Sequence, residues 1–185
     1  MASNDLRAFV QWTDVLERSR EETPVISRCE RDSTACSSLR LVAWRSKIAT
    51  LAPQSPETQL WEINRFVNDL VPGACGLPEP GESWPTPVTV VQSGRGALAG
   101  AILKYASLRD VGWPAARLRI AVVTDVLRNC LTAVVLAETD DGSRLLDDRA
   151  LAVRETNRVG HFIAHYSFNE STRWIHLTPR QEAIP

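Results

Sequence analysis

Apolar residues in the first 70 positions recur at intervals of three and four residues, which is the spacing of one face of an α-helix. This pattern predicts three helices. The first begins at Leu6 and ends before Pro24, and the second covers residues 39–51. The third has the clearest start, because Ser55 is a favourable cap and Pro56 is suited to the first helical position.

A proline-rich loop and a helix of small residues follow. Residues 72–87 contain five of the eleven prolines, which excludes a long regular element there. Loops of this length inside a compact domain are often functional, so we expect it to border a site. The next helix is expected over residues 96–111, where alanine and glycine allow close packing and Gly112 provides the stop.

The last third of the chain is rich in β-branched and aromatic residues separated by turn residues, a pattern typical of an antiparallel sheet. The predicted fold class is therefore α+β, with N-terminal helices and a buried central helix packed on that sheet. We expect a single domain over residues 1–185, made of a helical part at 1–53, the proline-rich loop at 72–87, the central helix at 96–111 and the sheet at 118–177.

Composition and charge exclude some classes of protein. The 185 residues carry 21 Lys and Arg against 22 Asp and Glu, so the charge does not indicate a nucleic-acid partner. The longest apolar stretch, residues 131–137, is far shorter than the ~18 residues of a membrane-spanning helix. The first 20 residues are polar, which predicts a cytoplasmic protein as the chain stands, or a periplasmic one if a leader has been removed.

The four cysteines do not have the spacing of a metal site, so structural zinc is not expected. Cys29 and Cys36 enclose a short polar loop and can close a disulfide in an oxidising compartment. Two free thiols are the alternative. The cysteine spacing assigns no partner to Cys75 or to Cys130.

A series of motifs extends over about residues 60–177. They are residues 61–68, 84–87, 101–105, 107–109, 112–114, 118–119, 145–147 and 166–170, together with Trp174 and His176. Their order and spacing resemble the bacterial transglutaminase-like cysteine peptidases, of the periplasmic adhesin-cleaving type. The resemblance implies a papain-like, transglutaminase-like fold.

The resemblance also implies where a catalytic triad would lie. The family has its nucleophilic cysteine in a Gly-Asp-Cys-Glu-Asp run at the start of the central helix, and the matching position here is Ala97. Counting back from Asp147, the position of the family's histidine is Thr132. Only Asp147, which would orient that histidine, is retained. We therefore expect no catalytic residues and a pseudoenzyme.

The same run implies a calcium site in the adhesin-cleaving relatives, because calcium is held by several oxygen ligands. In this chain Gly96, Leu98 and Ala99 stand at the flanking positions and have no side-chain oxygen. The sequence therefore predicts no calcium and no other cofactor.

An enzyme with a relocated nucleophile is the alternative. Cys130 lies two residues from Thr132 and would share its face of a strand, and Cys75 is a second candidate thiol. His161 and His165 are four residues apart and would supply acid–base chemistry or a metal site together with Asp147 or Asp148. Histidines at the surface of the last hairpin are the simpler interpretation of the same spacing.

The main prediction is a catalytically inactive peptidase homologue that binds another protein, as a scaffold or accessory subunit. The expected contact surface is the former cleft, which the resemblance places beside Trp84 and Trp113 and the turn Gly94, Arg95 and Gly96. Aromatic side chains of this kind often anchor a partner.

Overall fold

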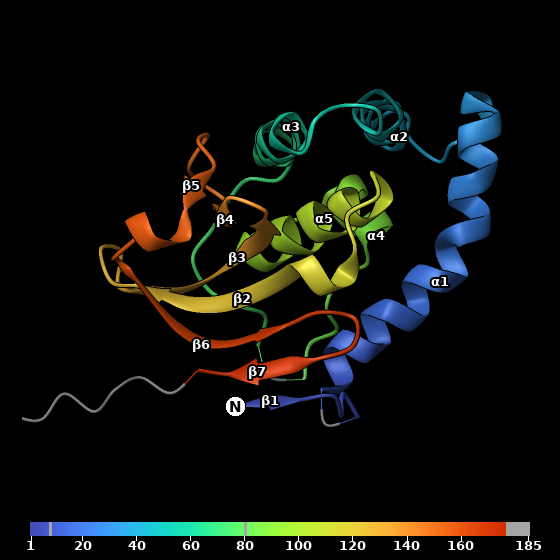
Figure 1. Ribbon diagram of the computed structural model, residues 1–185. Helices are drawn as coiled ribbons and strands as arrows, with labels where there is room; N and C mark the ends of the chain where they lie inside the picture. The colour runs from blue at the N-terminus through green and yellow to red at the C-terminus, as the bar shows by residue number, and fades with distance from the viewer. Residues whose placement is uncertain (8, 80, 177–185) are drawn as a thin grey trace, which may run out of the picture.

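The computed structural model describes residues 1–7, 9–79 and 81–176 and contains α-helices followed by one antiparallel sheet (Figure 1). The predicted α+β fold class is confirmed. The helices are α1 (Val10–Arg31), α2 (Leu39–Leu51), α3 (Pro56–Leu70), α4 (Pro87–Ser93) and α5 (Ala97–Asp110). The strands are β1 (Ala2–Ser3), β2 (Leu118–Asp125), β3 (Cys130–Thr139), β4 (Gly142–Leu146), β5 (Arg154–Glu155), β6 (Phe162–Phe168) and β7 (Arg173–Ile175).

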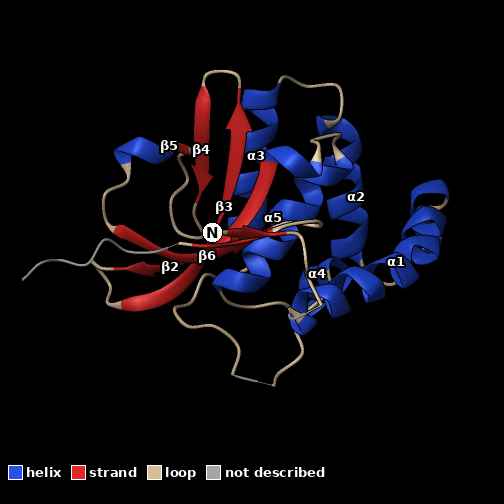
Figure 2. Ribbon diagram, turned by 60° about the horizontal axis from the view of Figure 1, so that its bottom comes forward, coloured by secondary structure: helices blue, strands red, loops and turns tan. Residues whose placement is uncertain are grey.

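The sheet has the strand order β1-β7-β6-β2-β3-β4-β5, and every neighbouring pair is antiparallel. The helices gather on one side of it (Figure 2). The predicted sheet range extends to residue 177, which lies outside the described residues. Within the described part of the chain, no helix is both long and apolar enough to cross a membrane.

The second and third helices lie where the sequence predicts them, and side-chain caps explain their starts. The Ser38 hydroxyl accepts a hydrogen bond from the Leu41 N–H at 3.1 Å, and the Ser55 hydroxyl accepts one from the Thr58 N–H at 3.3 Å. Each cap satisfies a backbone donor that the first helical turn leaves free.

The first helix differs from its prediction at both ends. It begins at Val10 rather than Leu6, and it continues through Pro24 to Arg31. A proline inside a helix removes one backbone hydrogen bond and its ring crowds the carbonyl four residues before it, but the turns after Pro24 still bury Cys29. Packing therefore outweighs the local helix-breaking signal here.

Helix α4 was missed because it is short and valine-rich. It begins at Pro87, directly after Thr86, whose hydroxyl accepts a hydrogen bond from the Thr89 N–H at 3.2 Å. Seven residues are too few to display a helical period, and β-branched residues do not favour helix. Val90 and Val91 are fully buried, so tertiary packing maintains this helix.

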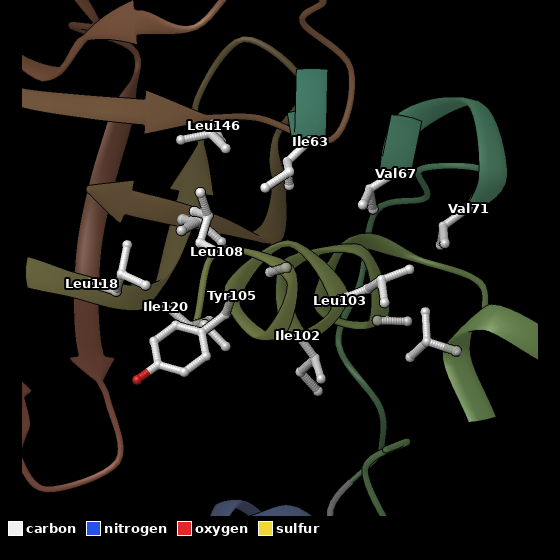
Figure 3. Close-up of a cluster of buried hydrophobic side chains, with 14 of the residues drawn as sticks. Ile63, Val67, Val71, Ile102, Leu103, Tyr105, Leu108, Leu118, Ile120 and Leu146 are labelled. Carbon is white, nitrogen blue, oxygen red and sulfur yellow. The ribbon is translucent and has the colours of Figure 1, made fainter. Parts of the chain in front are cut away.

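Helix α5 is the centre of the core, as predicted. Figure 3 shows it nearly end-on, with Ile63, Val67 and Val71 of the α3 region on one side and the sheet residues Leu118 and Ile120 on another. The alanine and glycine residues of its first turns allow its neighbours to approach the backbone closely. All of its residues up to Tyr105 are buried.

The two faces of the central strands belong to different apolar clusters. Ala133 and Val135 of β3 lie in the main core with α5, whereas Val134 lies in a second cluster with Val123 and Leu145. Successive side chains of a strand point to opposite faces. The register therefore defines which β3 side chains face α5.

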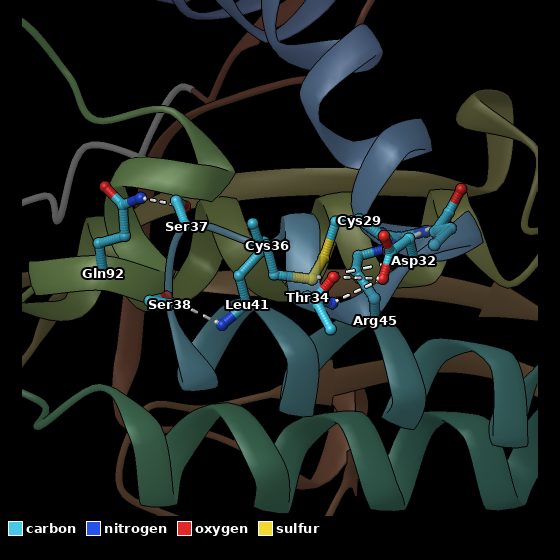
Figure 4. The surroundings of a disulfide bond; sticks show 10 residues. Cys29, Asp32, Thr34, Cys36, Ser37, Ser38, Leu41, Arg45 and Gln92 are labelled. Carbon is cyan, nitrogen blue, oxygen red and sulfur yellow. Dashed lines mark hydrogen bonds and ion pairs between the residues drawn. A yellow bond between two sulfur atoms is a disulfide. The ribbon is translucent and has the colours of Figure 1, made fainter.

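Of the two alternatives left open for Cys29 and Cys36, the structure has the disulfide. The bond joins the last turns of α1 to the segment before α2 (Figure 4). Between the two cysteines, the Asp32 carboxylate accepts hydrogen bonds from the N–H and the hydroxyl of Thr34 at 2.9 and 2.7 Å. The short loop is thus fixed both covalently and by its own polar residues.

Candidate functional site

The start of α5 carries no nucleophile. Ala97 is the first helical residue, as predicted, and its side chain is completely buried. Gly96 precedes it with φ of 86°, a conformation that L-residues rarely adopt. The backbone therefore turns sharply into the helix at this point, and a methyl group stands where the resemblance expects a thiol.

A short segment of the proline-rich loop covers this helix end. We call residues 72–76 the strap. The Pro72 carbonyl accepts a hydrogen bond from the Gly96 N–H at 3.1 Å, and the Ala74 carbonyl accepts one from the Ala97 N–H at 3.3 Å. Both donors are among the N–H groups that a helix start leaves without an internal partner. The strap thus satisfies them.

The strap is also attached to the start of β3. The Gly76 N–H donates to the Leu131 carbonyl at 2.8 Å, and Cys75 forms a disulfide with Cys130. Among the described residues, no cysteine is free. Cys130 or Cys75 could therefore act as a nucleophile only after this bond is reduced.

The register of β3 corrects the position assigned to the histidine. Thr132 pairs with Val123 and lies on the face of the second apolar cluster, opposite α5. The gapless count back from Asp147 to Thr132 is therefore wrong. The neighbouring side chains on the α5 side are those of Leu131 and Ala133, and neither can transfer a proton.

The retained aspartate lies in a buried charged group. The Lys104 ammonium, on the second turn of α5 beyond Ala97, donates to the Asp147 carbonyl at 2.7 Å. Burial lowers the pKa of Lys104 to about 7, although the nearby carboxylates of Asp148 and Asp147 oppose this shift. Lys104 lies in the matching stretch 101–105, but the motif alone did not indicate a buried cation beside Asp147.

Asp148 follows Asp147 in the chain, and its side chain packs against the strap. Burial, a hydrogen bond with the Asp147 side chain and repulsion by its charge raise the pKa of Asp148 to about 6. Its Oδ2 atom is buried without a hydrogen-bond partner and packs directly against Gly73. The charges of Lys104 and Arg149 oppose this rise, and the Nε atom of Arg149 lies 3.8 Å from that oxygen.

The histidines do not form the expected cluster. His165 is exposed, and its Nε2 atom forms a hydrogen bond of 2.7 Å with the Thr124 hydroxyl. The His161 ring packs on Phe162, with the ring centroids 4.3 Å apart. In the described ranges, no three His, Cys, Asp or Glu residues are grouped to hold a metal ion.

The two tryptophans expected at a partner surface are core residues instead. Trp84 is 7% exposed and packs against Phe9 and Phe168. Trp113 is 6% exposed, and its indole N–H donates to the Gln59 side chain at 2.8 Å. Loop position in the sequence did not reveal that both rings fold inward.

Of the expected partner surface, only the turn before α5 reaches solvent. Arg95 is exposed, and Gly94 and Gly96 are partly exposed. The same turn does not fit calcium, because Gly96 has no side chain and the buried Leu98 and Ala99 have no side-chain oxygen. The donor set that such an ion requires is missing from these positions.

Comparison with known proteins identifies the family and the fold. The family model described as bacterial transglutaminase-like cysteine proteinase matches residues 18–182. EGTA-treated LapG of Legionella pneumophila is 24% identical, with a TM-score of 0.70 over 83% of this chain and 86% of that chain. Calcium-bound LapG of the same organism is 21% identical, with a TM-score of 0.70 over 86% and 92%. No curated protein is matched.

Proposed function

The chain belongs to the bacterial transglutaminase-like cysteine proteinase family, and we propose that it is a non-catalytic member that acts by binding another protein. The observation that carries the proposal is the start of α5. Ala97 stands there in place of a nucleophile, and its N–H group is bonded to the strap. In acyl-transfer enzymes a backbone N–H at the nucleophile stabilises the oxyanion, so this donor too is occupied.

The composition of the neighbouring strand supports the same proposal. A cysteine peptidase needs a base beside its nucleophile to form the thiolate and to protonate the leaving amine. Strand β3, from Cys130 to Thr139, contains no histidine, and His165 is bonded to Thr124 on β2. Asp147 and Asp148 therefore have no imidazole to orient in this arrangement.

A peptidase with a relocated nucleophile is the second candidate, and membership of a proteinase family favours it. Reduction of the Cys75–Cys130 bond would release two thiols beside the start of β3. Neither thiol is at a helix N-terminus, where the dipole favours the thiolate. His161 and His165 remain the imidazoles that would have to serve them.

The two candidates are distinguished by turnover. The purified protein is incubated with a fluorogenic peptide library and an iodoacetamide probe, with and without a dithiol reductant, and the Cys75→Ser/Cys130→Ser protein is the matched control. We expect no cleavage in any sample and labelling of the reduced cysteines in the order of their exposure, fastest at Cys75 and slowest at the buried Cys29. Selective labelling of one cysteine, together with cleavage that the control lacks, would establish the peptidase.

We also propose that the stability of this protein does not depend on calcium. The absent side-chain oxygens at Gly96, Leu98 and Ala99 are the reason. Thermal unfolding with calcium and with a chelator is expected to give the same midpoint. A calcium-dependent rise that disappears when this turn is substituted would contradict the proposal.

The two disulfides support an oxidising compartment, since such bonds rarely persist in a reducing cytosol. Of the two locations considered from the sequence, the periplasmic one is therefore the one we propose. Fractionation of native cells, with detection of the protein by antibody, tests it.

A further inference from the structure

The strap is held by a bond that a reductant can break. Cys75 is exposed and Cys130 is partly exposed, so a dithiol can reach the disulfide. We propose that the strap is a disulfide-locked plug in a groove for an extended peptide segment, and that reduction opens this groove to a partner protein. The inference rests on the proposed binding function. It adds where the partner binds and how access to that site is regulated.

The contacts of the strap are those that a bound peptide would make. Two strap carbonyls accept from the N–H groups of Gly96 and Ala97, and one strap N–H donates to the Leu131 carbonyl. All three are backbone hydrogen bonds, which any extended segment can supply irrespective of its side chains. The groove therefore binds the backbone of an extended segment. In the oxidised protein that segment is the strap itself.

Asp148 gives an independent indication of a ligand. Its Oδ2 atom is buried below Gly73 and has no hydrogen-bond partner there. Glycine has no side chain that could donate to this oxygen. A partner segment that places a hydroxyl or amide donor over Asp148 gains a hydrogen bond that the strap lacks, and can therefore displace it.

The redox step is thiol–disulfide exchange. A dithiol reductant transfers two electrons and two protons to the Cys75–Cys130 bond, which becomes two thiols, while the reductant becomes a disulfide. The strap then retains its backbone hydrogen bonds but loses its covalent anchor. Surface segments held by so few bonds open locally without global unfolding.

Amide hydrogen exchange measures this opening directly. We compare the oxidised protein with the Cys75→Ser/Cys130→Ser protein and expect exchange at Gly76, Gly96 and Ala97 to accelerate about tenfold or more. Exchange within β2 and β3 should be unchanged, which shows that the fold is intact. The Cys29→Ser/Cys36→Ser protein keeps the strap locked and is the matched control for loss of a disulfide.

Two synthetic peptides test the groove. One is Val-Pro-Gly-Ala-Ser-Gly-Leu, the strap sequence with serine for cysteine, and the other also has alanine at the third position. We expect the first to bind the Cys75→Ser/Cys130→Ser protein but not the oxidised protein, and the second to bind more weakly, because a Cβ atom at the position of Gly73 would lie 2.3 Å from Oδ2 of Asp148.

Two results would overturn the inference: unchanged exchange at the three amides after the disulfide is removed, or faster exchange without binding of either peptide. Neither result bears on turnover. Cleavage of substrates by the reduced protein would instead overturn the proposed function, while leaving the opening of the strap as measured.

Discussion

Gly73 and Asp148 are packed so closely that a Cβ atom on Gly73 would lie 2.3 Å from Oδ2 of the aspartate. The two residues belong to segments 75 positions apart, the strap and the turn after β4. The requirement for glycine here comes from this contact. The strap can therefore lie flat over the start of α5 only while position 73 has no side chain.

The first prediction follows from this contact. Gly73→Ala should lower the free energy of unfolding by about 1–3 kcal/mol, the usual cost of overpacking. Asp148→Ala removes the obstructing carboxyl, so the double variant should regain part of that loss, with a coupling of about 0.5–3 kcal/mol. Urea unfolding of the four proteins measures both quantities, and strictly additive effects would contradict the contact.

The pH dependence of stability should reveal the buried charges. Asp148 has its pKa raised from 3.8 to about 6, so the folded state holds its proton more tightly than the unfolded state. The contribution of Asp148 is therefore present at low pH and is lost as pH rises from about 4 to 6. Asp148→Asn should flatten the stability profile in that window.

Lys104 acts in the opposite direction. Its pKa is lowered from 10.5 to about 7, so the folded state releases the proton more readily than the unfolded state. Stability should rise as pH increases from about 7 to 10, where the buried amine becomes neutral in the folded protein. Lys104→Met should remove this rise. Urea midpoints at intervals across both windows provide the test, and unchanged profiles in both variants would contradict the assignment.

The two disulfides should differ in their contribution to stability. Cys75 and Cys130 are 55 residues apart, whereas Cys29 and Cys36 are separated by 7. Loop-closure entropy predicts a loss of about 4 kcal/mol for the long loop and about 2.5 kcal/mol for the short one. Thermal and urea unfolding of the two double-serine variants should give this order, and the reverse order would show that strain or residual structure outweighs chain entropy.

The sequence was sufficient for elements with strong local signals. The apolar spacing over residues 39–51 and the capped start at Ser55 correspond to the observed helices α2 and α3, and the small residues after Gly96 correctly predicted a central helix. Local sequence signals gave wrong predictions where tertiary packing outweighs them. Pro24 did not end α1, because the turns beyond it bury Cys29.

The site was harder to predict because it depends on side-chain direction and on long-range pairing. The motif count reached Ala97 correctly but selected Thr132, which faces away from α5, since one residue of slip reverses the face of a strand. Trp84 and Trp113 lie in turns yet point into the core. The pairing of Cys75 with Cys130 joins distant segments and has no local signature.

A core substitution within α5 tests the packing of this helix. Leu103 is completely buried among side chains that include those of Val67 and Val71 (Figure 3). Leu103→Ala should cost about 2–5 kcal/mol through lost burial and the cavity left behind. Leu39→Ala, at a residue that is 87% exposed, is the matched control and should change stability by no more than ~0.5 kcal/mol. Equal effects of the two substitutions would contradict the central position of α5.

Position 97 can report on the strap. Ala97→Cys places a thiol at the N-terminus of α5, where the helix dipole favours the reactive thiolate. Ala97 is 0% exposed under the locked strap, so we expect slow alkylation by iodoacetamide when Cys75 and Cys130 are bonded. In the Ala97→Cys/Cys75→Ser/Cys130→Ser protein the strap is released, and labelling of the new thiol should be about tenfold faster or more.

Peptide mapping by mass spectrometry identifies the labelled cysteine and confirms that the remaining disulfides are native. The matched control is Ala97→Cys/Cys29→Ser/Cys36→Ser, which lacks the other disulfide and should label as slowly as the single variant. Equal rates in the locked and released proteins would mean that the strap does not control access to the start of α5. Faster labelling only in the released protein would show that its covalent anchor keeps this helix end closed.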